Sequence, residues 1–220
     1  MRDAYHDDLT IISETLVTMT KQVGIAITSA TEALLATDVT IAEDTISADR
    51  SVDEKRDELD DRVVDLLARQ QPVAGELRTV VAALRMADDI ERMGDLAGHI
   101  AKLTRLRYPQ AVVPDCIRLD IAAMGATGRR LADRLATVIA LQDEAGAQEL
   151  DRDDDDMDRV HRKLFTVMTG EGWTHSVETT IDVTLTSRYY ERYADHAVKA
   201  ARRVHYLVTG IRRPERPGVR

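Results

Sequence analysis

The sequence is poor in several residue types that define protein classes. Its 220 residues include one cysteine, one phenylalanine and one tryptophan, and aromatic residues make up only 4% of the chain. The single cysteine, Cys116, excludes an internal disulfide, and its position near an expected helix start marks it as an ordinary small residue. Alanine, leucine, valine and charged residues are abundant instead, and this composition favours helices packed through aliphatic contacts.

Long hydrophobic runs are missing as well. The best apolar stretches, residues 80–84 and 135–141, fall far short of the roughly 20 residues that a membrane-spanning helix needs. The first eight residues carry acids where a signal peptide carries basic residues and an apolar core. We therefore expect a cytoplasmic protein that meets a membrane only indirectly, through its partners.

The chain has fewer basic than acidic residues, and its formal net charge is −9 at pH 7. Binding to nucleic acid requires a positive surface, so we expect no nucleic-acid partner. The exception is the end of the chain, residues 211–220, which is rich in arginine and proline. We predict that this segment is a disordered basic tail.

Motifs of several enzyme classes are also absent from the sequence. There is no Gly-x-x-x-x-Gly-Lys loop to bind nucleotide phosphates, and no Glu-x-x-His pair of the kind that ferritin-type di-iron enzymes use. Scattered serine, histidine and aspartate residues form no recognisable nucleophile arrangement. We therefore expect no catalytic residues and a protein that is not an enzyme.

The chain does contain an internal duplication. Two registers describe it, an offset of 105 residues over the first part of each copy and an offset of 100 over the last part. The deletion between them falls at residues 70–75 of the first copy and 170–174 of the second, where glycine and proline indicate a loop. The acids that correspond are Asp49 and Asp154, Asp53 and Asp158, Glu91 and Glu191, and Asp95 and Asp195.

Apolar residues recur at three- and four-residue spacing in both copies, which is typical of helices with one buried face. Alternation typical of strands is not convincing anywhere. We predict an all-α fold of two tandem three-helix bundles, with six long antiparallel helices. The first bundle covers residues 1–107 and the second covers residues 114–210. Asp38 and Asp115 are the expected helix N-caps.

Each copy carries two acid-x-x-x-Asp pairs, and residues four apart share one face of a helix. A chain with 39 acids produces such pairs by chance. These pairs, however, fall at equivalent places on the second and third helices of each copy, which must be neighbours. If those faces meet, each copy gathers four carboxylates. Two interpretations stay open: a site for iron, manganese, magnesium or zinc, or a solvated acidic face with Arg92 and Arg192 as partners.

Taken together, these motifs resemble the paired signatures of the PhoU family. The stretch from Arg69 to Arg78 is similar to that family's connection into its third helix, and the resemblance covers residues 3–210. The motifs that carry it are Glu91-Arg92-x-x-Asp95 and Glu191-Arg192-x-x-Asp195, with Asp49-x-x-x-Asp53 and Asp154-x-x-x-Asp158 upstream.

The resemblance implies a negative regulator of phosphate uptake and of the phosphate-starvation response. Such a protein acts as a cytoplasmic adaptor between the ATPase subunit of the phosphate-specific ABC transporter and a sensor histidine kinase. The resemblance also implies two multinuclear iron or zinc sites at the eight matched acids, with manganese or magnesium as alternatives. We expect a homodimer. The alternative is a metal-free helical adaptor or scaffold with an unrelated signalling role.

Some positions depart from the family's pattern. His99 and Lys199 stand where many relatives have asparagine, and Lys102 and Arg202 stand where relatives often carry further acid. Because a cation beside a carboxylate cluster repels a metal ion, the occupancy and nuclearity of the sites stay open, and we expect the second site to be the more affected. His196 is expected to point to another face of its helix than the acids do.

Overall fold

The computed structural model describes residues 2–70 and 72–211, and this part of the chain is helical with no strand. The predicted tail therefore lies outside the described residues from 212 onward. The helices of the first half are α1 (Arg2–Ala36), α2 (Val39–Ala48), α3 (Arg50–Gln70) and α4 (Gly75–Arg107). The second half has the short 3-10 helix η1 (Asp115–Ile117) and then α5 (Arg118–Leu141), α6 (Glu144–Met168) and α7 (Val177–Thr209).

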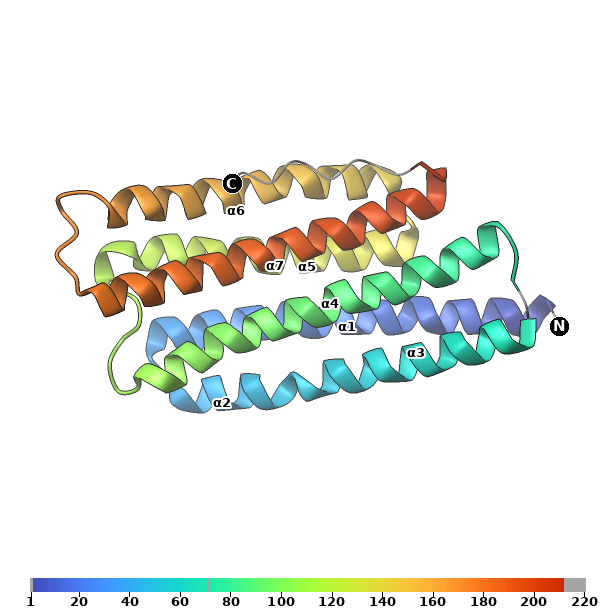
Figure 1. Cartoon of the computed structure of the whole chain (residues 1–220), viewed down its shortest axis with the longest axis horizontal. Helices are drawn as coiled ribbons and strands as arrows, with labels where there is room; N and C mark the ends of the chain where they lie inside the picture. Colours follow the sequence, from blue (N-terminus) through green and yellow to red (C-terminus); the bar gives the residue numbers. More distant parts are fainter. Residues whose placement is uncertain (1, 71, 212–220) are drawn as a thin grey trace.

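The helices lie side by side along one long axis (Figure 1). In the first half α1, α4 and the α2–α3 pair pack on one another, and in the second half α5, α6 and α7 do the same. The two halves meet where α1 packs on α5 and where α4 packs on α7. The all-α prediction of two tandem three-helix bundles is thus confirmed.

The second helix of the first half is interrupted at Asp49, which separates α2 from α3. Asp49 keeps helical dihedral angles, and its carbonyl oxygen accepts from the N–H of Val52 at 2.8 Å. Such a three-residue bond tightens the turn locally. The N–H of Asp53 also donates to the carbonyl oxygen of Asp49 at 3.3 Å, so α2 and α3 together form the second long helix of the first half. Its counterpart in the second half, α6, runs through without a break, and the prediction of six long helices is confirmed.

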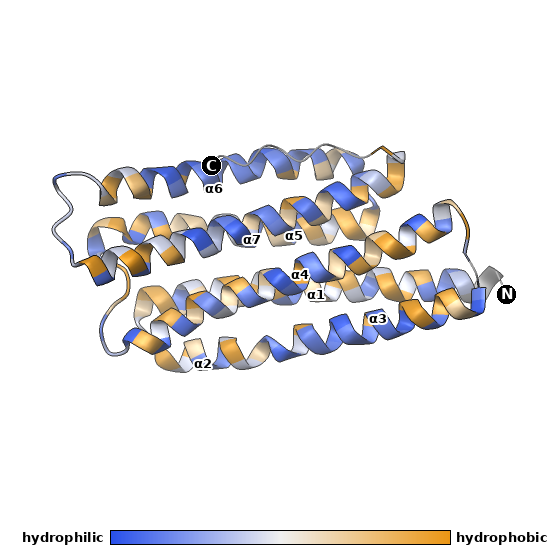
Figure 2. Cartoon of the chain, viewed as in Figure 1, coloured by the Kyte–Doolittle hydropathy of each residue, from blue (hydrophilic) through white to orange (hydrophobic). Residues whose placement is uncertain are grey.

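A single apolar core runs through both halves. On α1 the side chains of Met19, Val23 and Ile27 are completely buried, and on α7 the large rings of Tyr190 and Tyr193 are completely buried too. The outer helices α3 and α6 are mostly hydrophilic (Figure 2), as expected for helices that contact the core with one face only. The core therefore lies mainly among the four inner helices α1, α4, α5 and α7, and buried residues of the outer helices, such as Leu59 of α3 and Leu164 of α6, complete it.

The α1–α5 and α1–α7 contacts are close and partly polar. A Cβ atom at Gly125 would lie 2.4 Å from Oγ1 of Thr31, so glycine is what allows α5 to approach α1 here. The hydroxyl groups of Thr31 and Tyr190 lie 2.6 Å apart, and the hydroxyl of Tyr193 donates to the carbonyl oxygen of Val23 at 3.1 Å. Because buried hydroxyl groups need partners, these contacts fix α7 against α1.

One of the two N-cap predictions is correct. The carboxylate of Asp38 accepts from the backbone N–H groups of Thr40 and Ile41 at 2.9 and 3.1 Å. Asp115, in contrast, is the first residue of η1, and Pro114 occupies the preceding cap position without a side-chain hydrogen bond. The proline, with its fixed φ, sets the start of this short helix.

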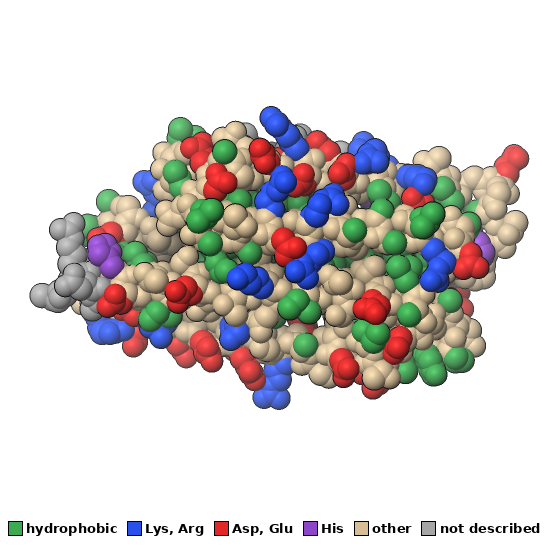
Figure 3. Space-filling view, turned by 180° about the vertical axis from the view of Figure 1, so that it is seen from behind, with side chains coloured by type: hydrophobic (Ala, Val, Ile, Leu, Met, Phe, Trp, Pro, Cys, Tyr) green, Lys and Arg blue, Asp and Glu red, His purple; other side chains and the backbone are tan. Residues whose placement is uncertain are grey.

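The side of the molecule formed by α1 and α5 carries acidic, basic and hydrophobic side chains intermixed (Figure 3). Within the described residues, no helix combines the length and the apolar character that crossing a membrane requires.

Candidate functional site

The structure brings the four acids of the first half together. Asp49 lies at the α2–α3 junction, Asp53 on α3, and Glu91 and Asp95 on the facing side of α4. Burial, followed by the charges of Asp53 and Asp95, raises the pKa of Asp49 to about 6. Burial and the nearby carboxylates also raise the pKa values of Asp53 and Glu91. These four residues, the first cluster, therefore repel one another when all are ionised.

Two glycines of α4 make room for Asp49. A Cβ atom at Gly94 would lie 2.7 Å from Oδ1 of Asp49, and a Cβ atom at Gly98 would lie 3.4 Å from Oδ2. The carboxylate of Asp49 thus lies directly against the backbone of α4. The second half has Ala194 and Val198 at the corresponding positions, so its acids cannot approach the third helix in the same way.

Basic residues partly neutralise the first cluster. Arg92 forms an ion pair with Asp95 one turn along α4. The charge of Arg56 lowers the pKa values of Asp53 and Glu91, and that of Lys102 lowers the pKa of Asp49, although burial and acidic neighbours outweigh both. The first cluster therefore contains its own counter-charges.

The acids of the second half form an equivalent cluster, called the second cluster below. Asp154 and Asp158 lie on α6, and Glu191 and Asp195 lie on α7. Burial, followed by the charges of Asp158, Asp195 and Glu191, raises the pKa of Asp154 to about 7. Burial likewise raises the pKa of Glu191, whose side chain is 13% exposed and pairs with Arg188 at 2.5 Å.

The cation expected beside the second cluster lies elsewhere. Arg202 donates from Nε and Nη2 to Oδ1 of Asp151 at 3.1 and 2.8 Å, so its charge is engaged by an acid outside the cluster. Lys102, its counterpart, acts on Asp49. Asp151 has no acidic equivalent in the first half, where Ile46 stands. Arg202 therefore does not act as the expected cation of the second cluster, while the prediction that the second site is the more affected stays a prediction.

The donor set suits hard cations, since carboxylate oxygens are the preferred ligands of Mg²⁺ and Mn²⁺ and bind iron as well. In the described part of the chain, however, no three Asp, Glu, His or Cys side chains already converge as a metal site. Asp95 is held by Arg92 and Glu191 by Arg188. A metal ion would have to displace these two guanidinium groups before the carboxylates could close around it.

The clearest polar feature missed by sequence reasoning is a pair of buried acids between α4 and α7. Asp89 accepts from Nε of Arg203 at 2.8 Å, and its other oxygen lies 3.0 Å from Nδ1 of His196. His196 thus contacts α4 rather than the acids of the second cluster. At the other end, Asp182 accepts from Nε and Nη2 of Arg107 at 2.6 and 3.0 Å.

A sequence signal for these acids did exist. Asp89 falls between Met86 and Met93 at helical spacing, and Asp182 precedes the buried Thr186 by one turn, so each acid lies on an otherwise buried helix face. An acid in such a place requires a buried cation. Because Arg107 and Arg203 come from the opposite half in each case, the two pairs lock the halves together.

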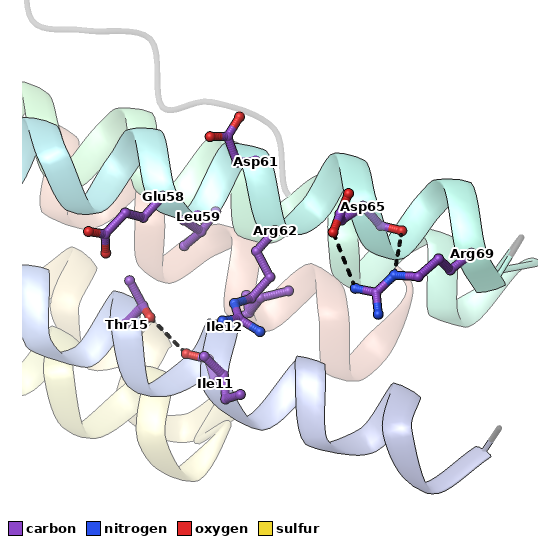
Figure 4. A pocket seen from close by; sticks show the side chains of 9 residues that line it. All are labelled: Ile11, Ile12, Thr15, Glu58, Leu59, Asp61, Arg62, Asp65 and Arg69. Carbon is purple, nitrogen blue, oxygen red and sulfur yellow. Dashed lines mark hydrogen bonds and ion pairs between the residues drawn. The ribbon is translucent and has the colours of Figure 1, made fainter.

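A hollow of about 380 Å³ lies between α1 and α3 (Figure 4). Within it Arg69 pairs with Asp65, and Arg62 donates to Oδ1 of Asp8 at 3.0 Å. Both arginines of the hollow therefore have acidic partners, and none of its lining residues belongs to either cluster. The lining residues are Ile11, Ile12, Thr15, Glu58, Leu59, Asp61, Arg62, Asp65 and Arg69.

Comparison with known proteins agrees with this architecture. The PhoU domain model matches residues 16–104 and residues 121–204, one segment in each half. The chain is 43% identical over 210 residues to the phosphate-specific transport system accessory protein PhoU homolog 2 of Mycobacterium tuberculosis, covering 96% of this chain and 99% of that protein. It is 41% identical over 210 residues to PhoU homolog 1 of Mycobacterium leprae, covering 96% and 95% of the two chains.

Solved structures share the fold. The crystal structure of PhoU from Pseudomonas aeruginosa superposes with a TM-score of 0.82 at 24% identity, over 94% of this chain and all of that one. The phosphate transport system regulatory protein PhoU from Streptococcus pneumoniae gives 0.83 at 21% identity, over 96% and 99%. With both halves matched by the domain model and with relatives above 40% identity over almost the whole length, this chain belongs to the PhoU family.

Proposed function

We propose that this protein is a negative regulator of phosphate uptake and of the phosphate-starvation response. The observation that carries the proposal is the 43% identity, over almost the full length of both chains, to a protein named as an accessory protein of phosphate-specific transport. A chain that keeps both PhoU domains and both acidic clusters has the parts for the same role. No enzymatic activity is expected of it.

In this role the protein acts as a cytoplasmic adaptor between the ATPase subunit of the phosphate ABC transporter and a sensor histidine kinase. Long helices with extensive exposed faces support this proposal, because such faces suit the docking of partners. Co-purification tests it: the tagged chain should retain both the ATPase subunit and the kinase from cells grown in high phosphate. Retention of neither would leave the adaptor role without support. The expected homodimer is tested by sedimentation velocity.

The regulatory role has its own test. Deletion of the gene should raise the output of the phosphate-starvation response, measured as alkaline phosphatase activity, in cells grown in high phosphate. The deletion strain should also lack any paralogue, since a second copy would mask the effect. Unchanged phosphatase activity in that strain would favour the alternative of a helical adaptor with an unrelated signalling role.

We also propose that the two clusters bind iron, zinc, manganese or magnesium, and that the second cluster binds more tightly. The support is electrostatic: burial, followed by the charges of four neighbouring acids, raises the pKa of Asp154 to about 7. A bound cation would add positive charge beside Asp154 itself, whereas Arg188 pairs with Glu191. Elemental analysis of protein purified without chelator should show metal that is lost in the Asp95→Ala/Asp195→Ala variant, and equal metal content in both proteins would exclude these acids as ligands.

A further inference from the structure

A basic cleft lies between the first three turns of α4 and the end of α7, at the right of Figure 1. Its volume is about 320 Å³. Its lining includes the side chains of Leu77, Arg78, Val81, Arg85, Arg203 and Tyr206. Three arginines around one hollow are unexpected in a chain with a net charge of −9.

The three guanidinium groups differ in their partners. Arg203 is engaged by the buried Asp89, and Arg78 lies over the ring of Tyr206, 5.2 Å from its centroid. Arg85 is exposed and forms no ion pair within residues 2–70 and 72–211. Arg78 and Arg85 therefore carry two charges that no carboxylate of the described chain neutralises.

The exposed acids of the same stretch of α4, Glu76 and Asp88, do not line the cleft. After burial, the charge of Glu76 contributes to the raised pKa of Tyr5 on α1, and the charge of Asp88 contributes to the raised pKa of Asp60 on α3. No acid among the residues that line the cleft offsets its positive charge. Local charge of this kind attracts acidic ligands, and more strongly at low salt.

The cleft is also apolar. Leu77 and Val81 are 42% and 38% exposed, and Val73, which precedes the first residue of α4, is 71% exposed. Spacing of four residues places Leu77 and Val81 along one line of the helix, and Figure 2 shows hydrophobic and hydrophilic residues together on this part of α4. The stretch from Leu77 to Arg85 rises about 12 Å, the length of a little more than two helical turns.

We propose that this cleft docks an acidic amphipathic helix of a partner protein. Leucine-like side chains of that helix fill the hollow beside Leu77 and Val81, and its carboxylates pair with Arg78 and Arg85. Recognition of this kind combines the apolar anchors of helix-in-groove binding with charge-assisted hydrogen bonds. The inference draws on the proposed adaptor role only for the source of the helix, because the binding itself can be measured without any cellular partner.

The duplication provides an internal control for the role of charge. At the start of α7, Val177 and Ile181 stand where α4 has Leu77 and Val81, and they are 77% and 53% exposed. Glu178 replaces Arg78 there, and the nearby cation Arg107 is paired with both Glu178 and Asp182. This second stripe is as apolar as the first but offers no unpaired arginine at the position of Arg78, so an acidic helix should avoid it.

The experiment uses the full chain and two fluorescein-labelled designed peptides. Both have leucines at helical spacing, one flanked by glutamates and the other by lysines in the same places. Fluorescence anisotropy at low salt should show at least tenfold tighter binding of the acidic peptide. The charge-reversed Arg78→Glu/Arg85→Glu variant should reverse this preference, a gain that an unfolded protein cannot produce. Ile181→Ser, in the second stripe, should leave both affinities unchanged.

Three outcomes would overturn the proposal. One is equal affinity of the acidic peptide for wild type and for the Arg78→Glu/Arg85→Glu variant. Another is displacement of the peptide by inorganic pyrophosphate with no effect of Leu77→Ser, because the cleft would then be a site for small anions. The third is concentration-dependent sedimentation that is lost in the Arg78→Glu/Arg85→Glu variant. That result would show that the cleft binds a second copy of this chain. None of these bears on the phosphatase test of the regulatory role.

Discussion

Lys102 lies close enough to Asp49 to lower the pKa of that carboxyl, against the larger effects of burial, Asp53 and Asp95. The equivalent cation of the second half, Arg202, is bound to Asp151 instead. One duplicated chain thus holds two clusters with the same acids and different counter-charges, and this inequality can be measured.

Removal of the Lys102 charge should strengthen metal binding at the first cluster. We expect the Lys102→Gln variant to bind Mn²⁺ roughly fivefold more tightly, because a charge several ångströms away contributes on the order of 1 kcal/mol near a protein surface. The measurement is a calorimetric titration in an Asp195→Asn background, which disables the second cluster. Arg202→Gln is the matched control and should leave the affinity for Mn²⁺ unchanged. An equal effect of both variants would contradict the claim that Lys102, and not Arg202, acts on a cluster.

Asp154 should make the folded protein less stable as the pH rises. Its pKa in the folded chain is about 7, against an ordinary value of 3.8. The folded state therefore retains a proton that the unfolded state has lost, so the free energy of unfolding falls between about pH 4 and pH 7. With chelator present, Asp154→Asn should raise that free energy at pH 8 by about 1–2 kcal/mol after allowance for solvent screening, and by little at pH 4.

Urea denaturation across this pH range tests the prediction. Asp49→Asn is the comparison and should give a smaller gain, because the pKa of Asp49 rises only to about 6. If Asp154→Asn has the same pH dependence as wild type, Asp154 does not titrate in this interval.

The contact of Asp89 with Arg203 and His196 should contribute strongly to stability. Asp89→Ala leaves the guanidinium of Arg203 and the ring of His196 facing a buried position without a carboxylate, and removal of one partner of a buried ion pair typically costs about 3–5 kcal/mol. The neighbouring Asp88→Ala changes an exposed side chain and should alter the free energy of unfolding by about 0.5 kcal/mol or less. Equal urea midpoints for the two variants would show that the α4–α7 interface does not depend on this network.

Close approach of α5 to α1 should make Gly125 intolerant of a side chain. The added methyl group of Gly125→Ala would overlap Thr31, and we expect a loss of about 1–3 kcal/mol in the free energy of unfolding. A Cβ atom at Gly172 would have no heavy atom within 4 Å, so Gly172→Ala is the control. Thermal denaturation of the two variants side by side decides whether the α1–α5 contact is as close as the structure has it.

Much of this architecture could be predicted from the sequence, because helical periodicity and an internal duplication are local or repeated signals. The acids of each cluster could be grouped for the same reason, since Asp49 and Asp53 share a helix face and the third helix must lie beside the second. The occurrence of the acids at equivalent positions in the two copies, rather than their four-residue spacing, predicted that they group together.

What could not be predicted depends on contacts between distant residues. The carboxylate of Asp89 and the guanidinium of Arg203 are separated by 114 residues, and nothing in periodicity pairs them. The direction of a long side chain cannot be predicted from the sequence either. Arg202 could pair with an acid of the second cluster or with Asp151, and the packing of α6 on α7 brings it to Asp151.

The most direct measurement for the central claim is the initial rate of radiolabelled phosphate uptake by cells grown in high phosphate. A negative regulator predicts faster uptake in a strain that lacks this gene and its paralogues, and a return to the wild-type rate when this chain is supplied on a plasmid. Uptake at the wild-type rate in the deleted strain would contradict the proposed function.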